Sequence, residues 1–219
     1  MIFMTGTKPD YIKNNTRIKG ETDKPPSSEP LRQFFDVLFS IVALIILSPG
    51  IIILAILIRI SGKGPVIYSQ DRIGKYGKPF VIYKFRSMIY NAETGNPQLS
   101  GINEERITRI GKFIRKYRVD EIPNFINVIK CDMSIVGPRP ERQFFIEQIL
   151  ERNPDFSKLL KVKPGITSWG QVKYGYATNV DEMLERLDYD LYYIKNRSLW
   201  FDIKIFLYTI ITILKGKGL

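Results

Sequence analysis

The chain has 219 residues, with 33 lysines and arginines against 22 aspartates and glutamates, a net charge of +11, and no histidine. The length predicts one domain with short appendages, and the charge indicates an anionic partner such as phosphate, lipid headgroups or nucleic acid. Without histidine, Ser–His and Cys–His catalysis and His-ligated metal sites are excluded. The single cysteine, Cys131, excludes an intramolecular disulfide. Chemistry therefore falls to Asp, Glu, Lys, Tyr or Ser.

Residues 1–30 are polar and rich in Lys, Thr, Pro and Ser, which predicts a disordered tail. Residues 37–58 then form an uncharged run, and a straight helix of that length is about 33 Å, enough to cross a bilayer. Ser48 and Pro49 interrupt the run, because Pro49 cannot donate to the carbonyl of Ile45 and the Ser48 hydroxyl can satisfy that group.

Basic residues flank this apolar run on both sides, so the positive-inside rule gives no orientation for a span. A re-entrant membrane helix over residues 31–60, broken at Ser48 and Pro49, fits both features. A Pro-kinked spanning helix is the alternative.

Two β-rich stretches, 66–70 and 80–85, flank a Gly- and Lys-rich turn and predict a hairpin. Its second strand presents Lys84 and, on the same face, Arg86. A polar loop over residues 90–105 follows, and then a helical stripe that begins at Ile107 and carries Arg115 in its last turn.

An adjacent acid pair, Asp120–Glu121, follows the basic run that includes Arg115. Pro123 is tolerated only in the first turn of a helix, so a helix is predicted to begin close to Glu121. A helix N-terminus stabilises the charged form of a carboxylate. An ionised Asp can serve as a covalent nucleophile, and Glu can bind Mg²⁺ together with substrate phosphates. The simpler alternative is an N-cap followed by a first-turn acid.

Arg139 lies between Pro138 and Pro140, which stiffen the backbone around a guanidinium suited to phosphate. Residues 141–160 read as a structural helix of mixed charge. The charge-free run within residues 200–219 is too short to span a bilayer and predicts an interfacial helix followed by a basic tail. A buried core helix is the alternative there.

The segment from Asp120 to Pro140 resembles the signature of the bacterial sugar transferases, which are monotopic polyprenyl-phosphate phosphoglycosyl transferases. The matching residues are the acid pair and the run NVIKCDMSIVGPRP. The stretch around Lys84, the block 163–172 and the stretch 187–199 resemble further family motifs. Ser168 stands where the family usually has Gly, and residues 173–176 (KYGY) replace an Asn-Gly-Arg-Asn run of the short members, so donor specificity does not carry over.

The resemblance implies that Asp120 attacks a nucleotide sugar, releases UMP and passes the sugar phosphate to a polyprenyl phosphate. It also implies Mg²⁺ at Glu121 and phosphate contacts from Lys84, Arg115, Arg139, Pro138 and Pro140.

We therefore expect an α+β protein: a tail (1–30), the re-entrant helix (31–60), a mainly helical cytoplasmic catalytic domain with a small hairpin (61–199), and the interfacial segment (200–219). The expected partners are a UDP-sugar, polyprenyl phosphate and the bilayer of the bacterial inner membrane, with no nucleic acid, and homo-oligomerisation is left open. Two rivals remain: a Mg²⁺-dependent membrane phosphohydrolase, and a basic membrane-anchored protein that binds anions without catalysis.

Overall fold

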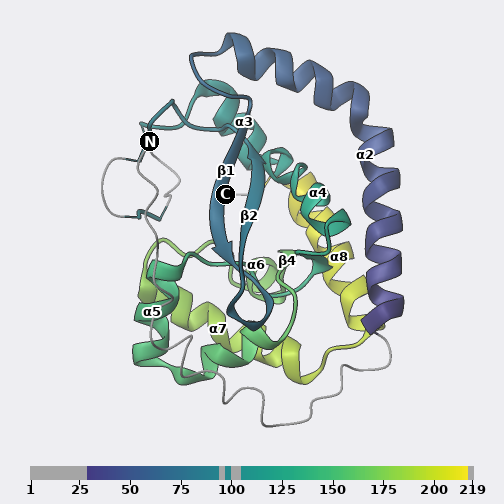
Figure 1. Ribbon diagram of the computed structural model, residues 1–219, viewed down its shortest axis with the longest axis vertical. Coiled ribbons are helices and arrows are strands. Elements are labelled where there is room, and N and C mark those ends of the chain that lie inside the picture. Colours follow the sequence, from purple (N-terminus) through teal and green to yellow (C-terminus); the bar gives the residue numbers. More distant parts are fainter. Residues whose placement is uncertain (1–28, 94–96, 100–104, 217–219) are drawn as a thin grey trace.

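The computed structural model describes residues 29–93, 97–99 and 105–216, and shows a mixed fold that is mostly helical (Figure 1). Nearly all of the predicted tail therefore lies outside the described residues. The elements that follow helix α2 (Glu29–Ile60) are, in order, β1 (Ile67–Ile73), the 3-10 turn η2 (Lys75–Gly77), β2 (Pro79–Phe85), α3 (Arg109–Lys116), the 3-10 turn η3 (Val119–Glu121), α4 (Asn124–Ile129), β3 (Ser134–Val136), α5 (Gln143–Arg152), the 3-10 segment η4 (Pro154–Lys161), β4 (Gly165–Thr167), α6 (Trp169–Lys173), α7 (Val180–Lys195) and α8 (Leu199–Leu214).

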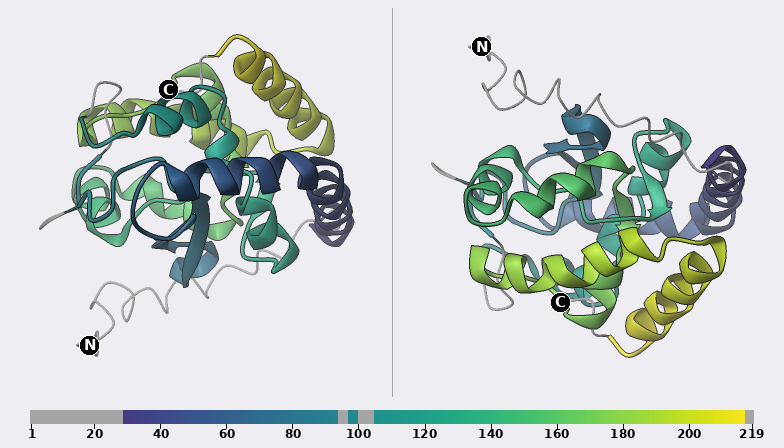
Figure 2. Two further views of the ribbon diagram at one scale, coloured as in Figure 1. Left: turned by 90° about the horizontal axis from the view of Figure 1, so that it is seen from above. Right: turned by 90° about the horizontal axis from the view of Figure 1, so that it is seen from below.

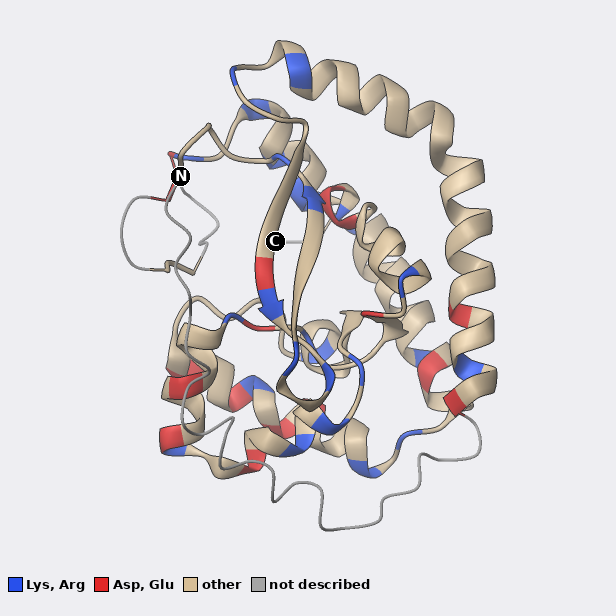
Figure 3. Cartoon of the chain, in the orientation of Figure 1, with Lys and Arg blue, Asp and Glu red and all other residues tan. Residues whose placement is uncertain are grey.

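Helix α2 is bent but not broken. All of its 32 residues stay helical through Pro49, and Figure 1 shows a sharp change of axis partway along. The Ser48 hydroxyl donates to the Ile45 carbonyl at 2.8 Å, as predicted for the group that Pro49 leaves without a donor. Figure 3 shows charge on α2 only in its first turns and near its other end, and residues 37–58 are uncharged. By length and composition, α2 is the one helix of the described chain that could cross a membrane.

Both ends of α2 are attached to the rest of the fold. Near its start, Arg32 forms a 2.5 Å ion pair with Asp202 of α8. Phe39 packs edge-on against Phe206 of α8 with 5.3 Å between ring centroids, and Figure 2 shows α2 and α8 on the same side of the molecule. At its other end, the Arg86 guanidinium donates to the carbonyls of Ile58, Gly62 and Lys63. Arg86 thus satisfies orphan carbonyls at a helix C-terminus.

The predicted hairpin is confirmed as an antiparallel pair of β1 and β2, in which Tyr68 lies opposite Lys84. The apolar side chains of the hairpin pack in two separate clusters. Phe85 contacts Ile58 and Ile114 in one apolar cluster, and Ile82 contacts Val128 and Met133 in another. The hairpin therefore bridges the end of α2 to α3 and α4.

A second, parallel pair joins β3 to β4, with Val136 opposite Thr167. It places the Gly137–Pro140 segment beside the 163–165 segment. The chains approach so closely that a Cβ on Gly165 would lie 2.1 Å from the Gly137 nitrogen. Only glycine fits there, which explains one glycine of the 163–172 block.

The largest apolar cluster lies between α5, η4 and α7 and includes Ile146, Leu160 and Leu187. The predicted helix over 141–160 is thus two elements, because Asn153 adopts extended backbone and caps η4 through its side chain. Helix α8 buries Ile205 in the core while Trp200 is 77 % exposed. One face of α8 is therefore part of the core and the other is open.

Candidate active site

The acid pair lies in the turn η3, between α3 and α4. Arg118 precedes this turn in the left-handed region, with φ 54°, which separates it from α3. Helix α4 begins after Pro123, at Asn124. The pair therefore does not lie at a helix N-terminus as predicted: α4 begins three residues after Glu121, and the pair makes the connection between two helices.

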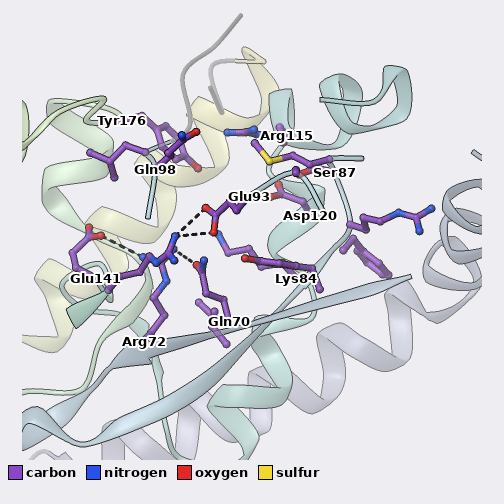
Figure 4. A pocket seen from close by; sticks show the side chains of 18 of the residues that line it. Gln70, Arg72, Lys84, Ser87, Glu93, Gln98, Arg115, Asp120, Glu141 and Tyr176 are labelled. Carbon is purple, nitrogen blue, oxygen red and sulfur yellow. Dashed lines mark hydrogen bonds and ion pairs between the residues drawn. The ribbon is translucent and has the colours of Figure 1, made fainter. Parts of the chain in front are cut away.

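A cavity of about 440 Å³ opens beside this turn and contains Asp120 in its wall (Figure 4). Lys84 from β2, Arg115 from α3 and Arg139 from the loop after β3 also line it. Four of the predicted site residues, which are up to 55 positions apart in the sequence, are thus brought to one cavity. Volumes of 300–1,000 Å³ are usual for small-molecule sites.

Glu121 does not line this cavity and is 4 % exposed. Its Oε1 accepts from Lys84 Nζ at 2.7 Å and from Arg139 Nη1 at 3.2 Å. Its Oε2 accepts from Arg118 Nη2 at 2.7 Å and Nε at 3.1 Å. The two acids therefore have different surroundings.

The pKa values of the two acids move in opposite directions. Burial, with the negative charge of Glu121, raises the pKa of Asp120 to about 6, and Lys84, Arg115 and Arg118 only partly offset this. This direction is opposite to the one expected from a helix N-terminus. Burial would also raise the pKa of Glu121, but Arg118, Lys84 and Arg139 outweigh it and hold that pKa well below its usual range.

Pro138 and Pro140 are buried and do not line the large cavity. The Pro138 carbonyl accepts from Gly165 N at 2.9 Å, and the Pro140 carbonyl accepts from Arg72 Nη1 at 3.1 Å. Pro138 and Pro140 therefore have a supporting position, because they hold the backbone that carries Arg139.

Arg86, which shares a strand face with Lys84 in the sequence pattern, also lines the cavity. Its donors are engaged by the end of α2, so its main contacts are structural. Ser168, at the position where glycine is usual, is fully buried and caps α6 by accepting from Gln171 N at 3.0 Å. The substitution therefore adds a helix cap.

The structure adds residues that sequence reasoning did not assign to the site. Arg118 lies three positions before Glu121, a spacing that allows ion pairs, but nothing in the pattern distinguished it from its basic neighbours. Glu141 joins Arg186 of α7 at 2.6 Å and Arg72 of β1 at 3.4 Å on the far wall of the cavity. Tyr176 lines the cavity from the loop after α6, and no local signal marked it.

Magnesium usually takes one or two carboxylates, with substrate phosphates and water. The acid pair fits that donor type, although the described residues contain no group of three Asp, Glu, Cys or His side chains that could hold a metal. Both oxygens of Glu121 already accept hydrogen bonds, and the two partners of Oε1, Lys84 and Arg139, line the cavity. Binding at Glu121 therefore requires that one of these two cations release Oε1.

The chain belongs to the bacterial sugar transferase family, whose model matches residues 27–216. It is 44 % identical, over 86 % of its length, to the UDP-N-acetylgalactosamine-undecaprenyl-phosphate N-acetylgalactosaminephosphotransferase of Aeromonas hydrophila, and covers 44 % of that protein. It is 38 % identical to the UDP-glucose:undecaprenyl-phosphate glucose-1-phosphate transferase of Escherichia coli K12, over 85 % of this chain and 40 % of the relative. It is also 38 % identical to the undecaprenyl-phosphate galactose phosphotransferase of Salmonella typhimurium, over 88 % and 42 % respectively.

The chain thus spans less than half the length of these relatives. Their names give three different sugars, so the similarity points to a reaction type without selecting a donor.

Proposed function

We propose that the protein is a phosphoglycosyl transferase that moves a sugar 1-phosphate from a UDP-sugar to a polyprenyl phosphate such as undecaprenyl phosphate, the first membrane step in building an exopolysaccharide or related glycan. The observation that carries this proposal is the division of labour in the acid pair. Asp120 faces a cavity lined by cations, while Glu121 is turned inward and compensated by three cations.

In the proposed reaction a carboxylate oxygen of Asp120 attacks the β-phosphorus of the UDP-sugar. The bond between that phosphorus and the oxygen bridging to the α-phosphate breaks, and UMP leaves with the electron pair. An oxygen of polyprenyl phosphate then attacks the same phosphorus, which releases the Asp120 carboxylate and forms the polyprenyl diphosphate sugar. Donor and acceptor use one cavity in turn.

The raised pKa of Asp120 suits this role. With a pKa of about 6, the side chain is mostly ionised at neutral pH and is more basic than an ordinary Asp carboxylate. Lys84, Arg115 and Arg139 would bind the phosphates, and Arg139 offers a planar guanidinium for two phosphate oxygens. Pro138 and Pro140 would serve by fixing Arg139. Mg²⁺ held by Glu121 would supply further positive charge near the phosphates.

We also propose that α2 is a re-entrant helix, that the catalytic domain (61–199) faces the cytoplasm at the bacterial inner membrane, and that α8 lies at the interface. The attachments of α2 support this. Its start is tied to Asp202 and its end to Arg86, both in the same globular part. Because both ends of α2 contact the same globular part, we expect them to lie on the same side of a bilayer. The bend at Pro49 lets the helix enter the membrane and return.

Release of UMP by the purified protein in lipid nanodiscs tests the reaction. We expect sustained UMP release from one of UDP-N-acetylgalactosamine, UDP-glucose or UDP-galactose only when polyprenyl phosphate is present. The Asp120→Asn variant should release none, while Asp188→Asn, at an exposed position of α7, should match the wild type. Sustained release without the acceptor would indicate a phosphohydrolase, and no release with any donor would favour a non-enzymatic anion binder.

A further inference from the structure

Tyr176 is the second of the two tyrosines in the KYGY run (173–176), and it lies in the wall of the cavity that contains Asp120 (Figure 4). Its ring is in contact with two guanidinium groups. The Arg139 Cζ lies 5.1 Å from the ring centroid and the Arg118 Cζ lies 5.6 Å from it. Both distances are within the range of a cation–π contact.

Apart from the Tyr176 ring, Arg118 and Arg139 have very different contacts. Arg118 is 8 % exposed and donates to Glu121 through two nitrogens, at 2.7 and 3.1 Å, and to the Ile166 carbonyl. Arg139 lines the cavity and donates to Glu121 through a single nitrogen at 3.2 Å. The orientation of Arg139 therefore depends more on the Tyr176 ring than that of Arg118 does.

We propose that Tyr176 is a positioning residue for phosphate binding, whose ring holds the Arg139 guanidinium in place for the diphosphate of the donor. This inference rests on the proposed function for its substrate, and it assigns a task to the KYGY run. A planar guanidinium binds two phosphate oxygens well only if its plane is fixed before the ligand arrives, because ordering it afterwards costs affinity.

The hydroxyl group of Tyr176 has no part in this task. Within the described chain it makes no hydrogen bond with another residue, and the ring alone provides the contact with Arg139. Tyr176→Phe should therefore behave as the wild type, whereas Tyr176→Leu removes the aromatic face and leaves Arg139 with its single bond to Glu121.

Calorimetric titration with inorganic pyrophosphate tests the proposal directly, since this probe has neither base nor sugar. We expect Tyr176→Leu to weaken pyrophosphate binding about tenfold, which corresponds to 1.4 kcal/mol, and Tyr176→Phe to stay within about twofold of the wild type. Tyr174→Leu is the matched control, because Tyr174 lies in the same run, outside the cavity, where its hydroxyl donates to Glu185. In an Arg139→Gln background, Tyr176→Leu should have no further effect.

Pyrophosphate binding that is equal in the wild type and Tyr176→Leu, or absent in the wild type, would overturn the proposal. The proposal would also be overturned if Tyr176→Leu lost affinity for UDP but not for pyrophosphate, because the ring would then contact the base. Should Tyr176→Leu fail to fold, Tyr176→Met gives the same comparison. An inactive wild type would refute the proposed transfer reaction, yet the pyrophosphate titration would still decide the role of Tyr176.

Discussion

Replacing Asp120 by Asn should stabilise the folded protein even though it removes the proposed nucleophile. The pKa of Asp120 is raised from 3.8 to about 6 in the folded state by burial and by Glu121. Ionising this group therefore costs more in the folded chain than in the unfolded chain. Two pKa units correspond to about 3 kcal/mol at 1.36 kcal/mol per unit, which is an upper bound because the side chain is only partly buried.

The sign of the pH dependence follows from proton linkage. Between pH 4 and pH 6 the folded state binds more protons than the unfolded state, so the wild type loses stability as the pH rises through this window. Asp120→Asn has no proton to lose there. The stability difference in favour of the variant should thus be small at pH 4, grow up to about pH 6, and stay constant above it.

Chemical denaturation of both proteins in the same detergent at pH 4.5 and pH 7.5, followed by fluorescence, measures this difference. Asp188→Asn, at an exposed position, is the control and should show no such growth. If Asp120→Asn were no more stable than the wild type at pH 7.5, or if the difference did not grow with pH, Asp120 would not be a destabilised buried carboxylate.

Four further predictions concern Glu121, the metal and α2. Glu121→Gln removes the negative charge that, together with burial, raises the pKa of Asp120, so the acid limb in the pH profile of the variant's residual turnover should lie below the wild-type limb, expected near pH 6; an unmoved limb would contradict its assignment to Asp120. The same variant leaves three cations uncompensated and should lower the free energy of unfolding by about 3–5 kcal/mol, measured by denaturation. Removal of Mg²⁺ with EDTA should abolish transfer and added Mg²⁺ should restore it, whereas full activity in EDTA would exclude a metal at Glu121. Pro49→Ala should straighten α2, as measured by cysteine labelling from each side of the membrane; labelling that still places both ends on one side would show that Pro49 does not cause the bend.

Local pattern was sufficient for the parts of the fold that are continuous in the sequence. The apolar run predicted α2, alternation and turn residues predicted the β1–β2 hairpin, and the spacing of Ile107, Ile110 and Ile114 predicted α3. The parallel pair of β3 and β4 was not predicted, because each strand has three residues and too few positions for a period to show.

The candidate site likewise combines residues that the sequence identified with contacts that it did not reveal. Asp120, Lys84, Arg115 and Arg139 were selected because they stand in motif blocks, and the structure brings all four to one cavity. The pairing of Glu121 with three cations depends on contacts across up to 37 positions, which no local pattern contains. The direction of the Asp120 pKa was mispredicted for a related reason. A helix N-terminus acts through amides that are local in the sequence, whereas the pKa of Asp120 is set mainly by burial in the folded chain.

The contact of Tyr176 with Arg118 and Arg139 likewise exists only in the folded chain, where the loop after α6 reaches the loops that follow α3 and β3. Residues of this kind define how a site is held together. They are found from the structure, while the proposed nucleophile, Asp120, was selected from the sequence.

Intact-protein mass spectrometry after mixing the protein with Mg²⁺ and each UDP-sugar, without lipid acceptor, tests the central claim most directly. We expect a mass gain of one sugar phosphate with the true donor, absent in Asp120→Asn and lost when polyprenyl phosphate is added. Formation of the lipid product without any such adduct would contradict a covalent intermediate on Asp120 and indicate direct transfer between two substrates bound together.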